Sequence, residues 1–541
     1  MNSVWLIAFS IIIFIIAYIT YGGWLVKKWG IDPTRKTPAK TMSDGVDYVP
    51  AKAPVLLGHH FASIAGAGPI VGPIVAAMFG WVPVLLWIVV GSVFFGGVHD
   101  MGSLFASVRH NGRSIGEVIG ETMGSKGKKL FSIFAWLTLI LVVAAFANIV
   151  AAAFVSTPEA ATSSLLFMVL AVGFGYAVYR RGLSLLLGTI IGVVGLAVCV
   201  WIGVLFPLNL SIQAWMIILL GYVFIASITP VWILLQPRDY LNSFLLYAML
   251  AGGILGLLFL RPEIQLPAFT SFKVGTNYMF PILFITIACG AVSGFHSLVA
   301  SGTTSKQLDN ESDIKLIGYG SMLIEGVLAT LAIITAAYLT STKLADLSSA
   351  GGALNVFADG IGTFMSSIGI PFIIAKNFVT LAIAAFALTT LDTATRLARF
   401  ILQEFFMVDS QKSNTAKSAV NIMTNKYVST LVTVVLSGAL AFKGYELIWP
   451  IFGSANQLLA ALALLSLAVW LKQTGRSYKM AIYPMIFMFA VTLSALVLLI
   501  MANLANPVIL VFAVILFILA IILIIESQKA FKVTEIQEDI K

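Results

Sequence analysis

The chain has 541 residues, of which 60% are hydrophobic and only 10% are charged. A typical soluble chain is about 45–50% apolar and about 25% charged. With so few charges, a surface of this size cannot be covered by water-facing side chains, so most of it must face lipid. The composition excludes a soluble enzyme, a disordered chain and a disulfide-rich secreted scaffold. We therefore expect an all-α polytopic membrane protein.

Apolar runs long enough for a membrane helix recur along the whole chain. A spanning helix needs about 20 mostly apolar residues, and about fifteen segments meet this condition. The first is expected to be a retained helix rather than a secretory signal, because no basic region precedes it and its apolar run is too long. The expected spans are 3–26, 55–80, 82–108, 130–155, 161–179, 184–206, 214–236, 241–260, 279–301, 317–340, 371–395, 427–442, 447–470, 480–501 and 504–525.

Basic residues fall mainly in alternate loops. Of the 32 Lys and Arg residues, 27 lie in one set of loops and the C-terminal tail, a set that includes Arg238 and the segment 396–426. This asymmetry marks the cytoplasmic side. It predicts a multi-pass protein of the plasma (inner) membrane, with the N-terminus outside and the C-terminus in the cytoplasm. The net charge of +9 is then explained by topology and by anionic lipids, so no nucleic-acid partner is expected.

The motifs of several other protein classes are missing from the sequence. It contains no GxxxxGK[ST] loop and no HExxH, so an ATP-driven pump and a zinc hydrolase of that motif are not supported. Cys199 and Cys289 lie in separate apolar runs, which predicts buried hydrophobic side chains rather than a disulfide or a metal site. We expect a protein that is not an enzyme and that has no cofactor or metal site.

Two of the spans contain helix-breaking residues at mid-membrane depth. In span 55–80, five such residues fall within 66–73, and in span 214–236 Pro230 follows the short polar residues Ser227 and Thr229. Prolines remove backbone donors and glycines lower the cost of unwinding. Unwound backbone at this depth survives only inside protein or beside a wet cavity. For Pro230 alone, a simple kink is the alternative. The five breakers are Gly66, Gly68, Pro69, Gly72 and Pro73.

The two broken spans run in opposite directions across the membrane, and each opens a group of five spans. This arrangement is the signature of the inverted repeats found in secondary transporters, where substrate lies between the broken helices. Exposed helix N-termini there offer N–H groups to an anion. The predicted organisation is an extra N-terminal helix and basic loop (1–54), a first repeat (55–206), a second repeat (207–405) and a four-helix C-terminal extension with a tail (406–541).

Ionisable residues inside the predicted spans are candidates for ion coupling. Asp100 and Glu325 have no basic partner close in sequence, so a proton relay and pairing with another helix are both open. Serines of span 279–301 either bond to their own helix or join backbone carbonyls in a sodium cage. Asp392 and Arg396, spaced i, i+4, are expected to form an ion pair. The ion-coupling candidates are Asp100, Glu325, His60, His99, His296, Ala65, Ser297 and Ser301.

Several long motifs resemble the carbon starvation protein A (CstA) family, and together they run from about residue 50 to about residue 470. They are GHHFASIAGAGPIVGPIVAAMFGW at 58–81, FFGGVHDMGS at 94–103, GFHSLVASGTTSKQL at 294–308, GYGSMLIEG at 318–326, FALTTLDTATRLARF at 386–400 and FGSANQLLAALALL at 452–465.

This resemblance implies a fold and a class of substrate. The family is grouped with the amino acid–polyamine–organocation superfamily, whose LeuT-type core is a five-plus-five inverted repeat with broken first and sixth core helices. By that resemblance, the second, seventh and ninth spans would correspond to core helices one, six and eight. The family is associated with uptake of peptides during carbon starvation, and close relatives with proton-coupled uptake of pyruvate.

We therefore expect a secondary transporter that imports a small carboxylate-bearing nutrient, either a peptide or pyruvate, by proton symport. Sodium coupling is the alternative, and a channel or a membrane-embedded starvation sensor is the weaker one. The substrate carboxylate is expected on N–H groups of 66–72, opposite Ser227 and Thr229. The expected partners are this small molecule and anionic lipids, and no oligomeric state is predicted. The predicted substrate-binding residues are Ser63, Gly66, Gly68, Gly72, Ser227 and Thr229.

Overall fold

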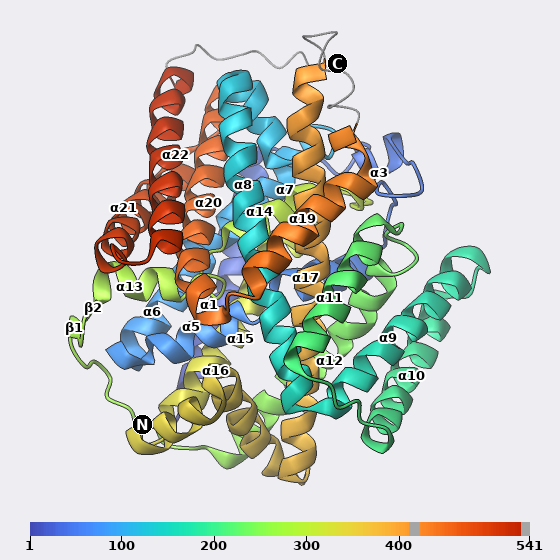
Figure 1. Ribbon diagram of the computed structural model, residues 1–541, viewed down its shortest axis with the longest axis vertical. Helices are drawn as coiled ribbons and strands as arrows, with labels where there is room; N and C mark the ends of the chain where they lie inside the picture. Colours follow the sequence, from blue (N-terminus) through green and yellow to red (C-terminus); the bar gives the residue numbers. More distant parts are fainter. Residues whose placement is uncertain (411–421, 532–541) are drawn as a thin grey trace.

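The computed structural model describes residues 1–410 and 422–531, which are helical almost throughout (Figure 1). The strands among them are β1 (Lys273–Val274) and β2 (Asn277–Tyr278), which form a small antiparallel pair. Within these residues, eleven helices are long and apolar enough to cross a membrane, and one bent pair of helices makes a twelfth. Helices bond their own backbone polar groups, as a lipid environment requires. The chain is a mostly helical, multi-pass membrane protein, as predicted.

The eleven long helices each coincide with one predicted span. They are Val4–Trp29 (α1, η1 and α2), Trp81–Arg109 (α6, η3 and α7), Ile115–Ser156 (α8), Pro158–Arg180 (α9 and η4), Leu185–Leu205 (α10), Leu235–Leu260 (α12), Glu311–Ala337 (η6, η7 and α15), Phe372–Met407 within α17 (Phe372–Ser410), Ile451–Gln473 within α20 (Tyr445–Gln473), Lys479–Ala502 (α21) and Ile509–Glu526 within α22 (Pro507–Phe531).

The other four predicted spans are short or broken, so length and composition support eleven or twelve spans rather than fifteen. Span 55–80 is the pair bent by 44°, and span 279–301 is two short helices separated by residues 287–293. These four segments are α4 (Ala53–Ile64) with α5 (Gly68–Ala76) and η2 (Ala77–Phe79), α11 (Ile212–Ile228), α13 (Met279–Thr286) with α14 (Gly294–Gly302), and α19 (Lys426–Ala441). Outside the spans lie α3 (Pro38–Thr41), η5 (Thr304–Lys306) and α16 (Ser341–Ser366).

The first predicted break is present in the structure. α4 ends at Ile64, and the Gly66 N–H donates to the Ile64 carbonyl at 2.8 Å instead of continuing the helix. α5 begins at Gly68, with Pro69 in its first turn, where a missing N–H removes no helical bond. Two half-helices therefore meet around residues 65–67 inside the bundle.

The second predicted break, at Ala226–Trp232, is instead the end of a helix. α11 ends at Ile228, Thr229 is extended (φ −76°, ψ 140°), and the next helix starts only at Leu235. The position before a proline disfavours helical backbone, and Pro230 has no N–H to continue the ladder. The prediction of a broken span over 214–236 was therefore wrong. The second broken segment is 287–293, between α13 and α14.

Loop contacts divide the molecule into two sides. Loop 30–52 bonds to the turns near residues 111, 231 and 307, and we call this face the basic side. Residues 1–3 bond to loop 261–278, which also contacts the start of α6, and we call this face the N-terminal side. The bonds on the basic side are Tyr48 Oη to Asn111 O (3.0 Å), Val231 N to Val46 O (3.1 Å) and Ala51 N to Gln307 O (2.9 Å).

Two long helices form the centre of the bundle, where α8 packs along α17 (Figure 1). Helices from the two halves of the chain make matching pairs around them. α5 packs on α15 and α14 packs on α7, while α8 packs on α20 and α17 packs on α12. Likewise, α11 packs on α17 and α19 packs on α8. The α9–α10 hairpin lies at the edge of the bundle (Figure 1).

Candidate functional site

The two broken segments pack directly against each other. A Cβ atom added at Gly68 would overlap the Cys289 side chain, and one added at Gly72 would overlap the Thr286 carbonyl oxygen. Glycine is therefore required at both positions by close approach of the two chains. Predicted residues Gly68 and Gly72 thus meet the segment 286–293, whose importance the sequence did not reveal.

A cavity of about 570 Å³ reaches these breaks from the N-terminal side. Its wall includes Gly68, Thr286 and Cys289 at the breaks, and Thr276–Tyr278 of the loop on that side. None of its lining residues is Asp, Glu, Lys, Arg or His. They are aliphatic, aromatic or small and polar. Ligand sites typically have this composition, with few polar groups that orient the ligand. The cavity connects one face of the molecule to the unwound backbone.

Two neighbouring amide side chains of α20 hold the ends of the second broken helix. The Asn456 Oδ1 accepts from the Phe295 N–H at 2.8 Å, and its Nδ2 lies 3.1 Å from the Ser293 hydroxyl. Gln457 donates to the Phe284 carbonyl at 3.0 Å. These bonds fix α13 on one side of the break and α14 on the other. Their only mark in the sequence is the FGSANQLL motif that contains them.

The remaining predicted residues of the first break contact α17. The Ser63 hydroxyl bonds to the His59 carbonyl at 2.8 Å and lies 3.3 Å from the Thr393 hydroxyl. Thr390 donates to the Ser63 carbonyl at 2.9 Å. A Cβ at Gly66 would overlap Thr390 and an aromatic ring. Ser63 and Gly66 therefore lie between the break and α17.

Four of the predicted ion-coupling residues come together in one buried cluster. The Asp100 carboxylate of α7 lies 2.9 Å from Nδ1 of His296 on α14, and its other oxygen lies 2.7 Å from Nδ1 of His99. Nε2 of His296 lies 3.5 Å from the Glu325 carboxylate of α15, which is ion-pair distance rather than a formed hydrogen bond. All four side chains are fully buried. Asp100 and Glu325 therefore find their histidine partner on another helix.

The other coupling candidates take separate positions. Nδ1 of His60 lies 2.8 Å from the Thr304 hydroxyl. Ser297 and Ser301 donate to carbonyls of their own helix at 2.7 and 2.6 Å. Bonding to their own helix is one of the two alternatives given above for these serines. Ala65 is buried at the end of α4.

Ser227 and Thr229 lie elsewhere, on the basic side. The Thr229 hydroxyl donates to the Ile225 carbonyl at 2.8 Å. The backbone carbonyl of Thr229 accepts from the Arg396 guanidinium. Arg396 also donates to the Ala226 carbonyl at 2.7 Å. The structure therefore does not bring these two residues opposite Gly66–Gly72. The misplacement follows from the seventh span ending at Ile228.

The predicted ion pair between Asp392 and Arg396 is wrong. Asp392 pairs with Arg238 and accepts a 2.5 Å hydrogen bond from the Tyr222 hydroxyl. Arg396 pairs with Asp47 of loop 30–52 at 3.2 Å. Partners from other helices and from loop 30–52 outcompete the i, i+4 neighbour because the side chains are buried among them.

The count of basic loop residues placed Arg238 in a loop, but the structure places it in a helix. It lies in the first turn of α12, 1% exposed, and donates to the adjacent Asp239 at 2.7 Å. Several other basic residues counted for topology, those within 411–421 and in the tail 532–541, lie outside the described residues.

A strap formed by residues 46–48 covers the basic side. Asp47 pairs with Arg396 at 3.2 Å and with Arg399 at 3.9 Å, both on α17. The ammonium of Lys306 lies 5.4 Å from the centre of the Tyr48 ring. Burial raises the pKa of the Tyr48 hydroxyl to about 12, so this group stays neutral at physiological pH. The strap ties α17 to the turn after α11 on the side opposite the cavity opening.

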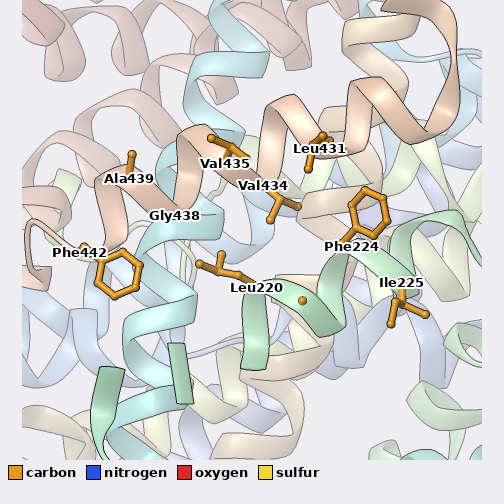
Figure 2. Close-up of a pocket in the computed structure, with 10 residues that line it drawn as sticks. Leu220, Phe224, Ile225, Leu431, Val434, Val435, Gly438, Ala439 and Phe442 are labelled. Carbon is orange, nitrogen blue, oxygen red and sulfur yellow. The ribbon is translucent and has the colours of Figure 1, made fainter. Parts of the chain in front are cut away.

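A second hollow is a groove of about 450 Å³ between α11 and α19 (Figure 2). All of its lining residues are apolar, so it offers no donor to a carboxylate. We therefore do not place substrate there. Its lining residues are Leu220, Gly221, Phe224, Ile225, Leu431, Val434, Val435, Gly438, Ala439 and Phe442.

Comparison with known proteins identifies relatives of the whole chain. The family described as "Carbon starvation protein CstA" matches residues 2–354 and 341–495. The peptide transporter CstA of Escherichia coli K12 is 34% identical, over 91% of this chain and 80% of the relative. The pyruvate/proton symporter BtsT of the same organism is 33% identical, over 88% and 78%. The peptide transporter CstA of Bacillus subtilis is 34% identical, over 86% and 84%.

Among solved structures, a manganese transporter mutant from Eremococcus coleocola is similar, with a TM-score of 0.52. It is 11% identical, and the match covers 90% of this chain and 99% of that chain. At this identity the likeness concerns the fold alone. In the part of the chain that the structure describes, no group of three or more His, Cys, Asp and Glu side chains is arranged as metal ligands.

Proposed function

The chain belongs to the carbon starvation protein CstA family, and from this premise we propose that it is a secondary transporter of a small carboxylate-bearing nutrient. The proposed substrate is a peptide or pyruvate, imported across the plasma (inner) membrane during carbon starvation together with protons. Relatives named as a peptide transporter and as a pyruvate/proton symporter support these two substrates. The observation that carries the proposal is a cavity ending at two facing helix breaks, beside a buried carboxylate–histidine cluster.

The proposed core is a five-plus-five inverted repeat of the LeuT type. The first repeat is α4–α5, α6–α7, α8, α11 and α12, and the second is α13–α14, α15, α17, α19 and α20. The matching helix pairs of the two halves support this arrangement. It replaces the boundaries 55–206 and 207–405 that followed from a break at Pro230. In this scheme α1–α2, the α9–α10 hairpin, α16 and α21–α22 surround the core.

The proposed substrate site is the inner end of the cavity. The carboxylate of the substrate would accept hydrogen bonds from N–H groups of the unwound segments 65–68 and 287–293, because helix N-termini attract anions. Gly66 and Gly68 remain the proposed residues of the first segment, while Gly72 lies one turn into α5. Cys289 takes the facing position earlier given to Ser227 and Thr229, since it lines the cavity and contacts Gly68.

The proposed proton site is the cluster of Asp100, His296 and Glu325, with His99 and His60 beside it. An imidazole between two buried carboxylates can take up a proton and neutralise one negative charge, which a low-dielectric interior favours. Because α7, α14 and α15 each supply one group, a change in protonation acts on three helices together. Sodium held by the Ala65 carbonyl with Ser297 or Ser301 is the alternative. We prefer the proton because the buried cluster supplies titratable groups, whereas the contacts of Ser297 and Ser301 are those of serines bonded to their own helix.

The proposed conformation is open on the outer side and closed on the inner side. The basic side would face the cytoplasm, by the distribution of Lys and Arg. The N-terminus would then lie outside. The cavity opens on that outer side, and the ion pairs of Asp47 close the inner one.

Uptake by proteoliposomes tests this proposal. Labelled pyruvate and a labelled dipeptide are offered separately, each under an imposed proton gradient and under an imposed sodium gradient. Accumulation of one substrate above its outside concentration under the proton gradient is the expected result. Accumulation under the sodium gradient alone would favour the alternative. Conduction that neither saturates nor shows counterflow would indicate a channel.

A further inference from the structure

His59 is a buried histidine that the proposed proton cluster does not use. It adjoins His60 on α4 but contacts a different helix, because adjacent residues point about 100° apart. Its Nδ1 lies 2.7 Å from the Asp239 carboxylate of α12, and both side chains are fully buried. A buried imidazole against a carboxylate is a group that can hold a second ring proton.

The charges around this pair are unbalanced without a further positive charge. Arg238 donates to Asp239 at 2.7 Å and also pairs with Asp392, so one cation faces two carboxylates. Tyr222 donates to Asp392 at 2.5 Å and adds no charge while its hydroxyl is protonated. With a neutral His59, the three charged groups nearest the ring, Asp239, Asp392 and Arg238, sum to about −1, which is costly in a buried setting. Arg396, Arg399 and Asp47 beyond Asp392 sum to about +1, so they offset this charge from farther away. An imidazolium at His59 makes the group neutral.

The amide of Gln307 adjoins the other ring nitrogen, and the amide of Gln236 in turn bonds to Gln307. Nε2 of Gln307 lies 3.3 Å from Nε2 of His59, and Oε1 of Gln307 accepts from Gln236 at 2.6 Å. The Oε1 of Gln236 has no hydrogen-bond partner among the described residues. In this arrangement His59 accepts at Nε2, as a neutral ring does.

Rotation of both amides gives the arrangement that suits a doubly protonated ring. Oε1 of Gln307 would then face His59, and its nitrogen would donate to the orphaned Oε1 of Gln236. Each ring nitrogen would have an acceptor, Asp239 on one side and Gln307 on the other. The rotation also gives up the hydrogen bond from Gln307 Nε2 to the Thr303 carbonyl at 3.2 Å, so the doubly protonated ring gains an acceptor at the expense of that bond.

We propose that His59, together with Asp239, Arg238 and Asp392, is a second buried proton-binding site. It is separate from the Asp100–His296–Glu325 cluster. It lies toward the basic side, since Gln307 bonds to Ala51 of loop 30–52. The charged or titratable groups around His59 are Asp239 and Arg238 of α12, Asp392 and, beyond it, Arg396 of α17 with its partner Asp47, Tyr222 of α11 and the neighbouring His60. The role that we infer for this site, the binding of a second proton in each transport cycle, rests on the proposed transport function. The test of proton binding at His59 does not depend on that function.

The test is nitrogen-15 NMR of histidine in the purified full-length protein in nanodiscs. The chain has five histidines, and His59→Gln identifies the His59 signals by their loss. The expected result is that wild-type His59 passes from neutral to doubly protonated between about pH 5 and 8. Asp239→Asn should lower the midpoint by at least about one pH unit, a tenfold loss of proton affinity. The matched variant Glu325→Gln, which removes a buried carboxylate of the other cluster, should shift it by less than half as much.

Three results would overturn the proposal. One is a wild-type His59 that does not change protonation between about pH 4 and 9. Another is a midpoint that moves by less than the expected shift in Asp239→Asn. The third is an equal shift in Glu325→Gln, because it would merge the two sites into one. The wild-type titration decides even where a variant fails to fold. Uptake that no gradient drives would instead overturn the proposed function and leave this result standing.

Discussion

The Asp100 carboxylate lies 2.9 Å from Nδ1 of His296, and this contact joins two helices through residues that are 196 positions apart in the chain. One of these helices, α14, follows the second helix break. Cys289, within that break, lines the cavity. A change of charge at Asp100 therefore bears on a helix that also borders the proposed substrate site. Coupling between two sites requires an element of this kind, which both sites influence.

Asp100→Asn should uncouple uptake from protons. For each proton moved with the substrate, a pH gradient of one unit supports about tenfold accumulation, since it equals about 1.36 kcal/mol. The variant should lose this accumulation while still exchanging labelled for unlabelled substrate. Glu121→Gln, a half-exposed carboxylate on the basic side, is the control and should accumulate normally. Full accumulation by Asp100→Asn would remove this residue from the coupling site.

Gly68→Ala should reduce uptake by about tenfold or more. The new methyl group overlaps the Cys289 side chain, and such overpacking costs about 1–3 kcal/mol. Gly173→Ala is the matched control, because a Cβ there meets nothing within 4 Å. The double variant Gly68→Ala/Cys289→Gly should regain part of the rate. Initial uptake rates, corrected for the amount of protein in the membrane, measure the effect. A normal rate in Gly68→Ala would place the substrate elsewhere.

Asp47→Asn should open the basic side. The ion pairs with Arg396 and Arg399 are lost, while the fold of the strap is retained by the Val46 carbonyl and the Tyr48 hydroxyl. In a Cys199→Ser background, the native thiol of Cys289 reports access to the breaks. An impermeant thiol reagent added on the basic side should label it several-fold faster in the variant. Asp32→Asn, in the same loop, should label as slowly as the parent. Equal labelling in both would mean that the strap is not a closure.

Arg238→Leu should destabilise the protein strongly. It leaves Asp239 and Asp392 buried without their cation, and breaking a buried pair in this way costs about 3–5 kcal/mol. Arg113→Leu, at a half-exposed arginine, should cost less than about 1 kcal/mol. Thermal unfolding of the purified variants in one detergent compares them. Similar melting temperatures would show that the buried network contributes little.

The sequence predicted the first break correctly because its signal is dense and local. Five glycines and prolines between residues 66 and 73 exceed what a kink needs. The second break was misplaced because Pro230 marks a helix end as well as a helix break, and only tertiary structure separates these outcomes. The true segment, 287–293, contains no proline, and Gly290 within it and Gly294 after it were its only local sign.

The candidate site, like the fold, could be predicted from the sequence only in part. Asp100, His296 and Glu325 could be chosen one by one because charges inside membrane spans are rare. Their meeting depends on how α7, α14 and α15 pack, which no local pattern records. Arg238 was missed because a basic residue between two apolar runs is typical of a loop, whereas two buried carboxylates hold it inside α12.

The uncharged wall of the cavity has a consequence for membrane voltage. Because its lining residues include no Asp, Glu, Lys, Arg or His, the charge that moves with the substrate is that of the substrate plus its protons. A monocarboxylate with one proton would cross without moving net charge, so its uptake would ignore the membrane potential. A second proton would make each cycle carry one positive charge inward, worth about 2.3 kcal/mol per 100 mV.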